Sequence, residues 1–174
     1  MKPLAALVGA IDLAVRPPGT VRETADAVAA AMAPFLARPD LLTAEQRAGD
    51  PAGYRQQVLH VADDGLYSLV ALVWLPGQTT PVHDHIAWCV VGVHEGEESE
   101  IRYRLVGEHL EEDCRVVNPQ GSAVGLVPPG DIHRVTNGGD AAAISLHVYG
   151  ADLRRRGTSI RRCYDIPVVG PRAA

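Results

Sequence analysis

Two short histidine-bearing segments constrain the fold of this chain most. The first spans residues 77–85 (GQTTPVHDH) and the second spans residues 128–133 (PPGDIH). On a β-strand, side chains at i and i+2 point to the same face, so His83 and His85 can both reach one metal ion. Pro and Gly in the second segment predict a tight turn, from which His133 enters the next strand. The three imidazoles predict a metal site with open coordination positions, as in catalytic sites.

The first fifty residues are predicted to be helical. Apolar side chains recur at helix-face spacing over residues 4–15, and Pro3 suits a first helical position. Residues 20–23 (TVRE) have the pattern of a capping box, which opens an alanine-rich helix to about Ala33. Pro34 is expected to end or kink that helix. Residues 43–46 predict one further short helical turn.

From about Tyr54 the chain changes character. Short segments rich in Val, Leu, Ile and aromatics alternate with Gly, Pro, Asn and Asp. The predicted strands are residues 66–75, 88–93, 100–106, 115–117, 123–127 and 144–149. This spacing predicts a closed or sandwiched β unit. We therefore expect a mainly β chain, with a helical layer at residues 1–50 and a β-barrel at residues 54–165. Together they are expected to form one domain over residues 1–174.

The two histidine segments resemble the motifs of the cupin family. Its first motif, G-x5-H-x-H, is matched by Gly77, His83 and His85, and its second, P-x-G-x2-H-x3-N, by Pro128, Gly130, His133 and Asn137. The resemblance implies an antiparallel cupin (RmlC-like) barrel whose metal is held by His83, His85 and His133. Common cupins carry a glutamate ligand a few residues after the first motif. Cys89 and Val90 stand there instead, which indicates a three-histidine site.

A further pattern lies at residues 145–149 (SLHVY), where strand alternation puts Ser145, His147 and Tyr149 on one face. In this company the set resembles the cysteine dioxygenase type I family. That resemblance implies iron(II) and oxidation of a small thiol by O2 to its sulfinate. It also implies that Tyr149 donates a hydrogen bond to the reactants, that His147 orients Tyr149, and that Ser145 orients His147. The alternative for this segment is an ordinary half-buried strand with its polar side chains outward.

The substrate is indicated by residues near Tyr54. Cysteine-specific members of the family place an arginine two residues after a tyrosine, whereas Gln56 stands there in this chain. This looks like the Gln-type enzymes, which are similar to bacterial 3-mercaptopropionate dioxygenases. In those enzymes an arginine near the C-terminus pairs with the substrate carboxylate, and Arg162 or Arg161 is the candidate here. If a shift in strand register turns Arg55 inward, L-cysteine becomes the better substrate.

Cys89 and Tyr149 are candidates for a contact between neighbouring strands. Some family members carry a thioether cross-link between such residues. Because the spacing from His85 is one residue shorter than in that pattern, the sequence favours a plain buried thiol over a cross-link between Cys89 and Tyr149.

The remaining features limit partners and location. The formal net charge is -5 and the basic residues form no long run, which argues against a nucleic-acid surface. No segment approaches a membrane span, and three widely spaced cysteines do not form a disulfide framework. A cytoplasmic monomer or small homo-oligomer is expected. The competing functions are a zinc or manganese cupin hydrolase or isomerase, and a non-enzymatic metal- or small-molecule-binding cupin.

Overall fold

The computed structural model describes residues 2–170. The first part of the chain forms α1 (Pro3–Val15) and α2 (Val21–Leu36). The strands then follow as β1 (Arg55–Val61), β2 (Ser68–Trp74), β3 (His83–His85), β4 (Cys89–Glu95), β5 (Glu97–Val106), β6 (His109–Pro119), β7 (Ala123–Leu126), β8 (His133–Thr136) and β9 (Ala143–Tyr149). The C-terminal part forms α3 (Leu153–Arg156), β10 (Ile160–Cys163) and β11 (Val168–Val169).

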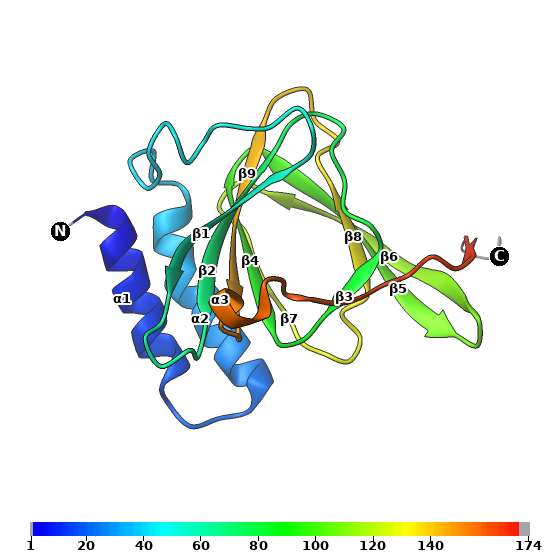
Figure 1. Cartoon of the computed structure of the whole chain (residues 1–174), viewed down its shortest axis with the longest axis horizontal. Helices are drawn as coiled ribbons and strands as arrows, with labels where there is room; N and C mark the ends of the chain where they lie inside the picture. The colour runs from blue at the N-terminus through cyan, green and yellow to red at the C-terminus, as the bar shows by residue number, and fades with distance from the viewer. Residues whose placement is uncertain (1, 171–174) are drawn as a thin grey trace.

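The strands form two sheets that face each other around a barrel (Figure 1). One sheet has the order β1-β2-β9-β4-β7 and the other β10-β3-β8-β5-β6-β11. Neighbouring strands pair antiparallel, except that β11 runs parallel to β6. The predicted mainly β, cupin-type barrel with an N-terminal helical layer is confirmed.

The helices cover the outer face of the β1-β2-β9-β4-β7 sheet (Figure 1). Leu7, Ile11 and Met32 from the helices share one hydrophobic core with Leu69 and Leu146 of the sheet. The capping box at the start of α2 is present, with the hydroxyl of Thr20 accepting from the Glu23 backbone N–H. Pro34 was expected to end or kink α2 near Ala33, but the helix continues through it to Leu36. The stretch at residues 43–46 is a hydrogen-bonded turn.

Strands β2 and β9 are buried on both faces along their whole length. Their outward side chains lie under the helices, and their inward side chains lie in the barrel. On β9 the outward positions include Leu146 and Val148. The polar residues Ser145, His147 and Tyr149 therefore point into the barrel, and the alternative of a strand with polar side chains toward solvent is wrong.

The loop between β2 and β3 is hydrogen-bonded to Asn137, which follows β8. Gly77 has φ +79°, in the left-handed region that favours glycine. Its backbone N–H donates to the carbonyl of Asn137. The Asn137 side chain donates in turn to the carbonyls of Trp74 and Ala141. Gly77 and Asn137, one from each motif, thus join the loop after β2 to the loop after β8.

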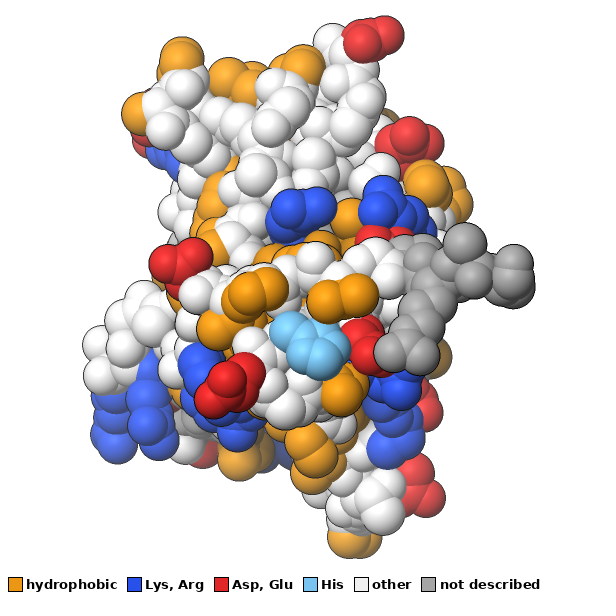
Figure 2. All heavy atoms as spheres, turned by 90° about the vertical axis from the view of Figure 1, so that its right-hand side faces the viewer, with side chains coloured by type: hydrophobic (Ala, Val, Ile, Leu, Met, Phe, Trp, Pro, Cys, Tyr) orange, Lys and Arg blue, Asp and Glu red, His pale blue; other side chains and the backbone are white. Residues whose placement is uncertain are grey.

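The face opposite the helices includes the β5–β6 end of the barrel. On this face, basic side chains are interspersed with acidic and hydrophobic ones (Figure 2). Within residues 2–170, the helices are all too short or too polar to span a membrane. That the helices and the barrel form one domain over residues 1–174 stays a prediction.

Candidate metal centre

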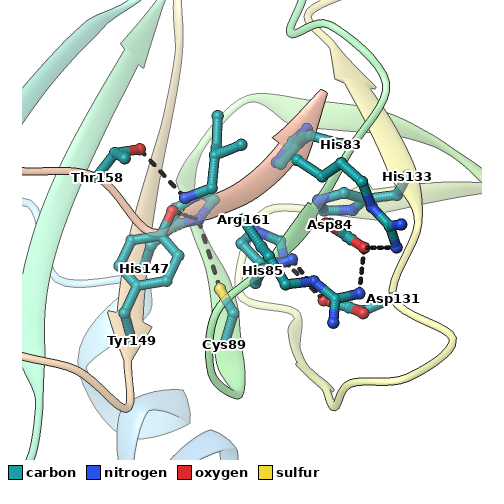
Figure 3. A network of polar contacts seen from close by, with 12 residues as sticks. His83, Asp84, His85, Cys89, Asp131, His133, His147, Tyr149, Thr158 and Arg161 are labelled. Carbon is teal, nitrogen blue, oxygen red and sulfur yellow. Dashed lines mark hydrogen bonds and ion pairs between the residues drawn. The ribbon is translucent and has the colours of Figure 1, made fainter. Parts of the chain in front are cut away.

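Three histidines converge inside the barrel. Strand β3 supplies His83 and His85, and β8 supplies His133, which is the register partner of His83. All three are at most 5% exposed. One ring nitrogen from each lies within 4.8 Å of the others. Figure 3 shows their rings grouped on one side of the site, with His147 and Tyr149 on the other.

Each of these rings is oriented by a hydrogen bond at Nδ1. His83 Nδ1 lies 3.0 Å from the carbonyl of Pro81, His85 Nδ1 lies 3.1 Å from Asp131 Oδ2, and His133 Nδ1 lies 2.8 Å from Glu100 Oε1. A carbonyl or carboxylate oxygen can only accept, so each Nδ1 carries the proton.

The three Nε2 lone pairs are therefore free to bind a cation. His133 Nε2 is buried without a hydrogen-bond partner, as expected of an atom that ligates a metal. Imidazole suits zinc, copper, iron and nickel, so the ligand set fits iron without selecting it.

The electrostatics of the centre favour neutral ligands backed by anions. Burial, together with the neighbouring His133 and His85, lowers the pKa of His83 to about 3. Burial raises the pKa of Glu100, but hydrogen bonds from His133 and Arg102 outweigh it and lower that pKa to about 2. Burial also raises the pKa of Asp131, but the hydrogen bonds that it accepts from His85 outweigh burial, and the net effect is a lowered pKa. Two carboxylates thus stand behind the ligands and offset the charge of a bound cation.

Asp131 and Glu100 were not singled out from the sequence. Asp131 lies two residues before His133, inside the second motif, and that position was a usable signal. Glu100 lies in a charged stretch at residues 97–100, which reads as solvent-exposed although Glu100 is 2% exposed.

Beside the histidines, β9 carries a continuous hydrogen-bonded chain. Tyr149 Oη lies 3.0 Å from His147 Nδ1, and His147 Nε2 lies 2.9 Å from Ser145 Oγ. The indole N–H of Trp74 donates to Ser145 Oγ at 3.1 Å. Burial, with His85 and His133 nearby, lowers the pKa of His147 to about 3. His147 is therefore neutral near pH 7, with one proton to share between its two partners.

A cavity of about 70 Å³ lies against both groups, which is room for a small molecule only. Its polar lining comprises the three histidines, His147, Tyr149, Tyr54, Gln56, Thr80, Thr158 and Ser159, and its apolar lining comprises Leu72, Trp74, Val135 and Ile160. The structure therefore brings the predicted ligands, Tyr149 and His147 to one cavity. Ser145 lies behind His147 rather than in the lining.

Gln56 and Arg55 point to different sides of β1. Gln56 pairs with Leu72 of β2, and both line the cavity. Gln56 is also exposed, so it lies at the cavity mouth. Arg55 donates instead to the backbone carbonyls of Glu45 and Ala48. The inward orientation of Arg55, which would favour cysteine, is not the one in this structure.

Arg161 and Arg162 do not line this cavity. Both donate to Asp84 Oδ2, as does the hydroxyl of Tyr164 at 2.8 Å. Asp84 lies between two metal ligands on β3 and is 1% exposed, and Figure 3 shows Arg161 reaching it. Their placement does not support the expectation that Arg161 or Arg162 holds a substrate carboxylate in the cavity. The contact instead fastens β10 to β3, which brings Ile160 to the cavity wall.

Cys89 lies inside the barrel, beside the hydrogen-bonded side chains of β9. It is the register partner of Tyr149, and its Sγ lies 3.9 Å from His147 Nδ1. Burial raises the pKa of the Cys89 thiol well above its ordinary value. The structure therefore brings the two residues of the possible cross-link together.

The sequence matches the family model described as cysteine dioxygenase type I over residues 22–156. The matched range takes in the three convergent histidines, Cys89 and the Ser145–Tyr149 segment. It ends before Arg161 and Arg162.

The solved structures to which the chain is similar include the following three, all of low sequence identity. A protein with a double-stranded β-helix domain from Klebsiella pneumoniae is 18% identical, with 62% of this chain and 85% of that chain covered and a TM-score of 0.49. A Cupin 2 conserved barrel domain protein from Salinispora arenicola is 22% identical, with 55% and 74% covered and a TM-score of 0.44. A recombinant oxalate oxidase in complex with glycolate is 22% identical, with 64% and 60% covered and a TM-score of 0.49.

Proposed function

The chain belongs to the cysteine dioxygenase type I family, and we propose that it oxidises a small thiol to its sulfinate with O2, using iron(II) held by His83, His85 and His133. In this reaction RSH and O2 give RSO2H, so both oxygen atoms enter the product. The observation that carries the proposal is that one ring nitrogen from each of the three histidines lies within 4.8 Å of the others, beside a buried tyrosine. Iron(II) in this site would supply open coordination positions at which a thiolate and O2 meet.

The protein side chains would act on the reactants as follows. Tyr149 lines the cavity, and the centroid of its ring lies 5.8 Å from that of His85. Its hydroxyl would donate a hydrogen bond to the reacting thiol or dioxygen. His147 would fix the orientation of that hydroxyl through its 3.0 Å contact, and Ser145 would fix His147.

The cavity supports a short thiol substrate with a polar tail. At about 70 Å³ it suits a molecule of a few heavy atoms. None of the described lining residues carries a guanidinium, an ammonium or a carboxylate group. A tail carboxylate would therefore meet neutral donors at the mouth, where the Gln56 amide is placed. With Gln56 at the cavity and Arg55 turned away, we propose 3-mercaptopropionate or a related thiol as substrate.

A thiol panel tests the substrate. We expect the iron-loaded protein to consume O2 fastest with 3-mercaptopropionate, more slowly with L-cysteine and slowest with cysteamine, which lacks the carboxylate. The variant Gln56→Leu should raise KM for 3-mercaptopropionate and leave KM for cysteamine unchanged. The matched control is Gln57→Leu: this partly buried glutamine lies on the same strand and is not among the lining residues. Faster oxidation of L-cysteine would overturn the substrate assignment, and absence of thiol-dependent O2 uptake would overturn the reaction.

A further inference from the structure

Glu98 on β5 is a buried carboxyl that the proposed reaction does not use. It is 0% exposed, and neither of its oxygens has a hydrogen bond of normal geometry within the described chain. The Ser145 hydroxyl and the Trp74 indole N–H lie close enough to Glu98 to lower its pKa. Glu98 therefore lies beside Ser145, at the end of the hydrogen-bonded series Ser145–His147–Tyr149 that is farthest from Tyr149.

The donors and acceptors of Ser145, His147 and Tyr149 permit two arrangements of hydrogen bonds. Ser145 Oγ has two acceptor positions and one donor, and the indole N–H of Trp74 occupies one acceptor position in both. Neutral His147 has one N–H, which lies either on Nε2 or on Nδ1. The two arrangements differ in the direction of every donor between Glu98 and Tyr149.

In the first arrangement a protonated Glu98 would donate its O–H to Ser145, and the Ser145 hydroxyl would donate to His147 Nε2. His147 then carries its proton on Nδ1 and donates to Tyr149 Oη, so the phenol proton is free to point into the cavity. In the second arrangement an ionised Glu98 would accept from the Ser145 hydroxyl, and Ser145 would accept from His147 Nε2–H. His147 Nδ1 then accepts the phenol proton, and Tyr149 no longer donates into the cavity.

We propose that Glu98 is a positioning residue whose proton sets the direction of the Ser145–His147–Tyr149 chain, and thereby whether Tyr149 donates to the substrate. The switch adds or removes one proton at Glu98 and reverses the hydrogen bonds along the chain, with no other bond made or broken. It deepens, and rests on, the proposed thiol oxidation.

The surroundings of Glu98 make the switch operate near neutral pH. Burial and the neighbouring Glu100 raise the pKa of Glu98, while the Ser145 and Trp74 groups lower it, with a net rise to about 7. Four other titratable side chains lie in the same part of the barrel: Glu100 on β5, Cys89 on β4, and His147 and Tyr149 on β9. Strands β2 and β6 contribute neutral side chains, Trp74 and Asn118. No cation within residues 2–170 pairs with Glu98 to hold it ionised.

The test reads the His147 tautomer directly. In the full chain loaded with Zn²⁺, which is diamagnetic, ¹⁵N NMR distinguishes a protonated from an unprotonated ring nitrogen. From about pH 6 to about pH 8.5 the His147 proton should move from Nδ1 to Nε2, with a midpoint at about 7. In Glu98→Gln the amide N–H2 replaces the protonated acid, so the proton should stay on Nδ1 throughout. Glu97→Gln, at an exposed site on the same strand, should titrate like the wild type.

Turnover provides the second readout. In the iron-loaded wild type, kcat should fall about tenfold per pH unit above the midpoint, and in Glu98→Gln this fall should disappear. A wild-type His147 tautomer that does not change with pH overturns the inference, even if Glu98→Gln fails to fold. A variant that titrates like the wild type overturns it as well. If neither the wild type nor Glu98→Gln oxidises thiols, the proposed reaction is wrong. The pH dependence of the His147 tautomer still decides the role of Glu98 in that case.

Discussion

Cys89 on β4 lies directly opposite Tyr149 on β9, as the register partner across two antiparallel central strands. Directly opposed side chains on one face of a sheet lie about 5 Å apart at Cβ. The thiol therefore lies beside the phenol that lines the metal cavity. The sequence favoured a plain buried thiol, because the spacing from His85 argued against this register. The structure removes that argument.

We predict that iron, O2 and turnover join Cys89 Sγ to the ring carbon of Tyr149 next to its hydroxyl. A carbon–sulfur bond forms, the thiol and ring hydrogens are lost, and O2 accepts the two electrons and protons. Peptide mass spectrometry should find residues 89 and 149 in one linked peptide, lighter by one hydrogen pair. The variant Cys89→Ser should abolish the linkage and Cys114→Ser, on β6, should retain it. A free Cys89 thiol after many turnovers would rule the linkage out.

Replacing Tyr149 by Phe removes one hydroxyl from the cavity and leaves the three ligands untouched. We expect turnover to fall about 100-fold, the effect typical of losing a hydrogen-bond donor aimed at developing charge. Iron content should be unchanged. Steady-state O2 consumption and metal analysis of the same preparation measure both, and unchanged kinetics would remove Tyr149 from the reaction.

Replacing Glu100 by Gln weakens the support of a metal ligand. The carboxylate accepts from His133 Nδ1 at 2.8 Å and so fixes which nitrogen faces the metal. Losing such a partner typically lowers metal affinity about 10- to 100-fold. Competition with a chelator of known affinity gives the value, and Glu97→Gln serves as the control. Equal affinities in the two variants would show that Glu100 does not support the site.

Glu98 also makes folding stability depend on pH. Its pKa rises from 4.5 to about 7 on folding, so between these values the native state holds the proton that the unfolded state releases. Stability from this group is complete below about pH 4.5 and is lost as pH rises toward 7, by about 3 kcal/mol. Urea unfolding of Glu98→Gln should therefore lack this decline. The free energy of unfolding of Glu98→Gln, relative to that of the wild type, should increase by about 3 kcal/mol between pH 4.5 and 8. A difference between the two proteins that does not vary with pH would contradict the assignment.

Much of the fold follows from local sequence signals. The capping box at Thr20 predicts the start of α2, and the apolar segments predict β2, β4 and β9 to within a few residues. The full extent of β1 was not predicted, because its sequence, RQQVLHV, mixes polar and apolar residues at the sheet edge, where burial is partial. Strands β10 and β11 are short and depend on pairing with distant strands.

The candidate site divides in the same way. Alternation on a strand was enough to place His83 with His85, and His147 with Tyr149, on common faces. The inward placement of Glu98 and Glu100 was not foreseen, because charged residues are mostly exposed and β5 begins earlier than residue 100. The positions of Arg161 and Arg162 depend on a register irregularity in β10, which only the pairing with β3 defines.

The most direct test of thiol oxidation at the three-histidine centre is product analysis under ¹⁸O2. Iron-loaded protein with 3-mercaptopropionate should yield a sulfinate in which both oxygen atoms carry the label, with one O2 consumed per thiol. The variant His133→Ala should lose both iron and product. Sulfinate labelled from water, disulfide as the product, or full activity in His133→Ala would contradict the account.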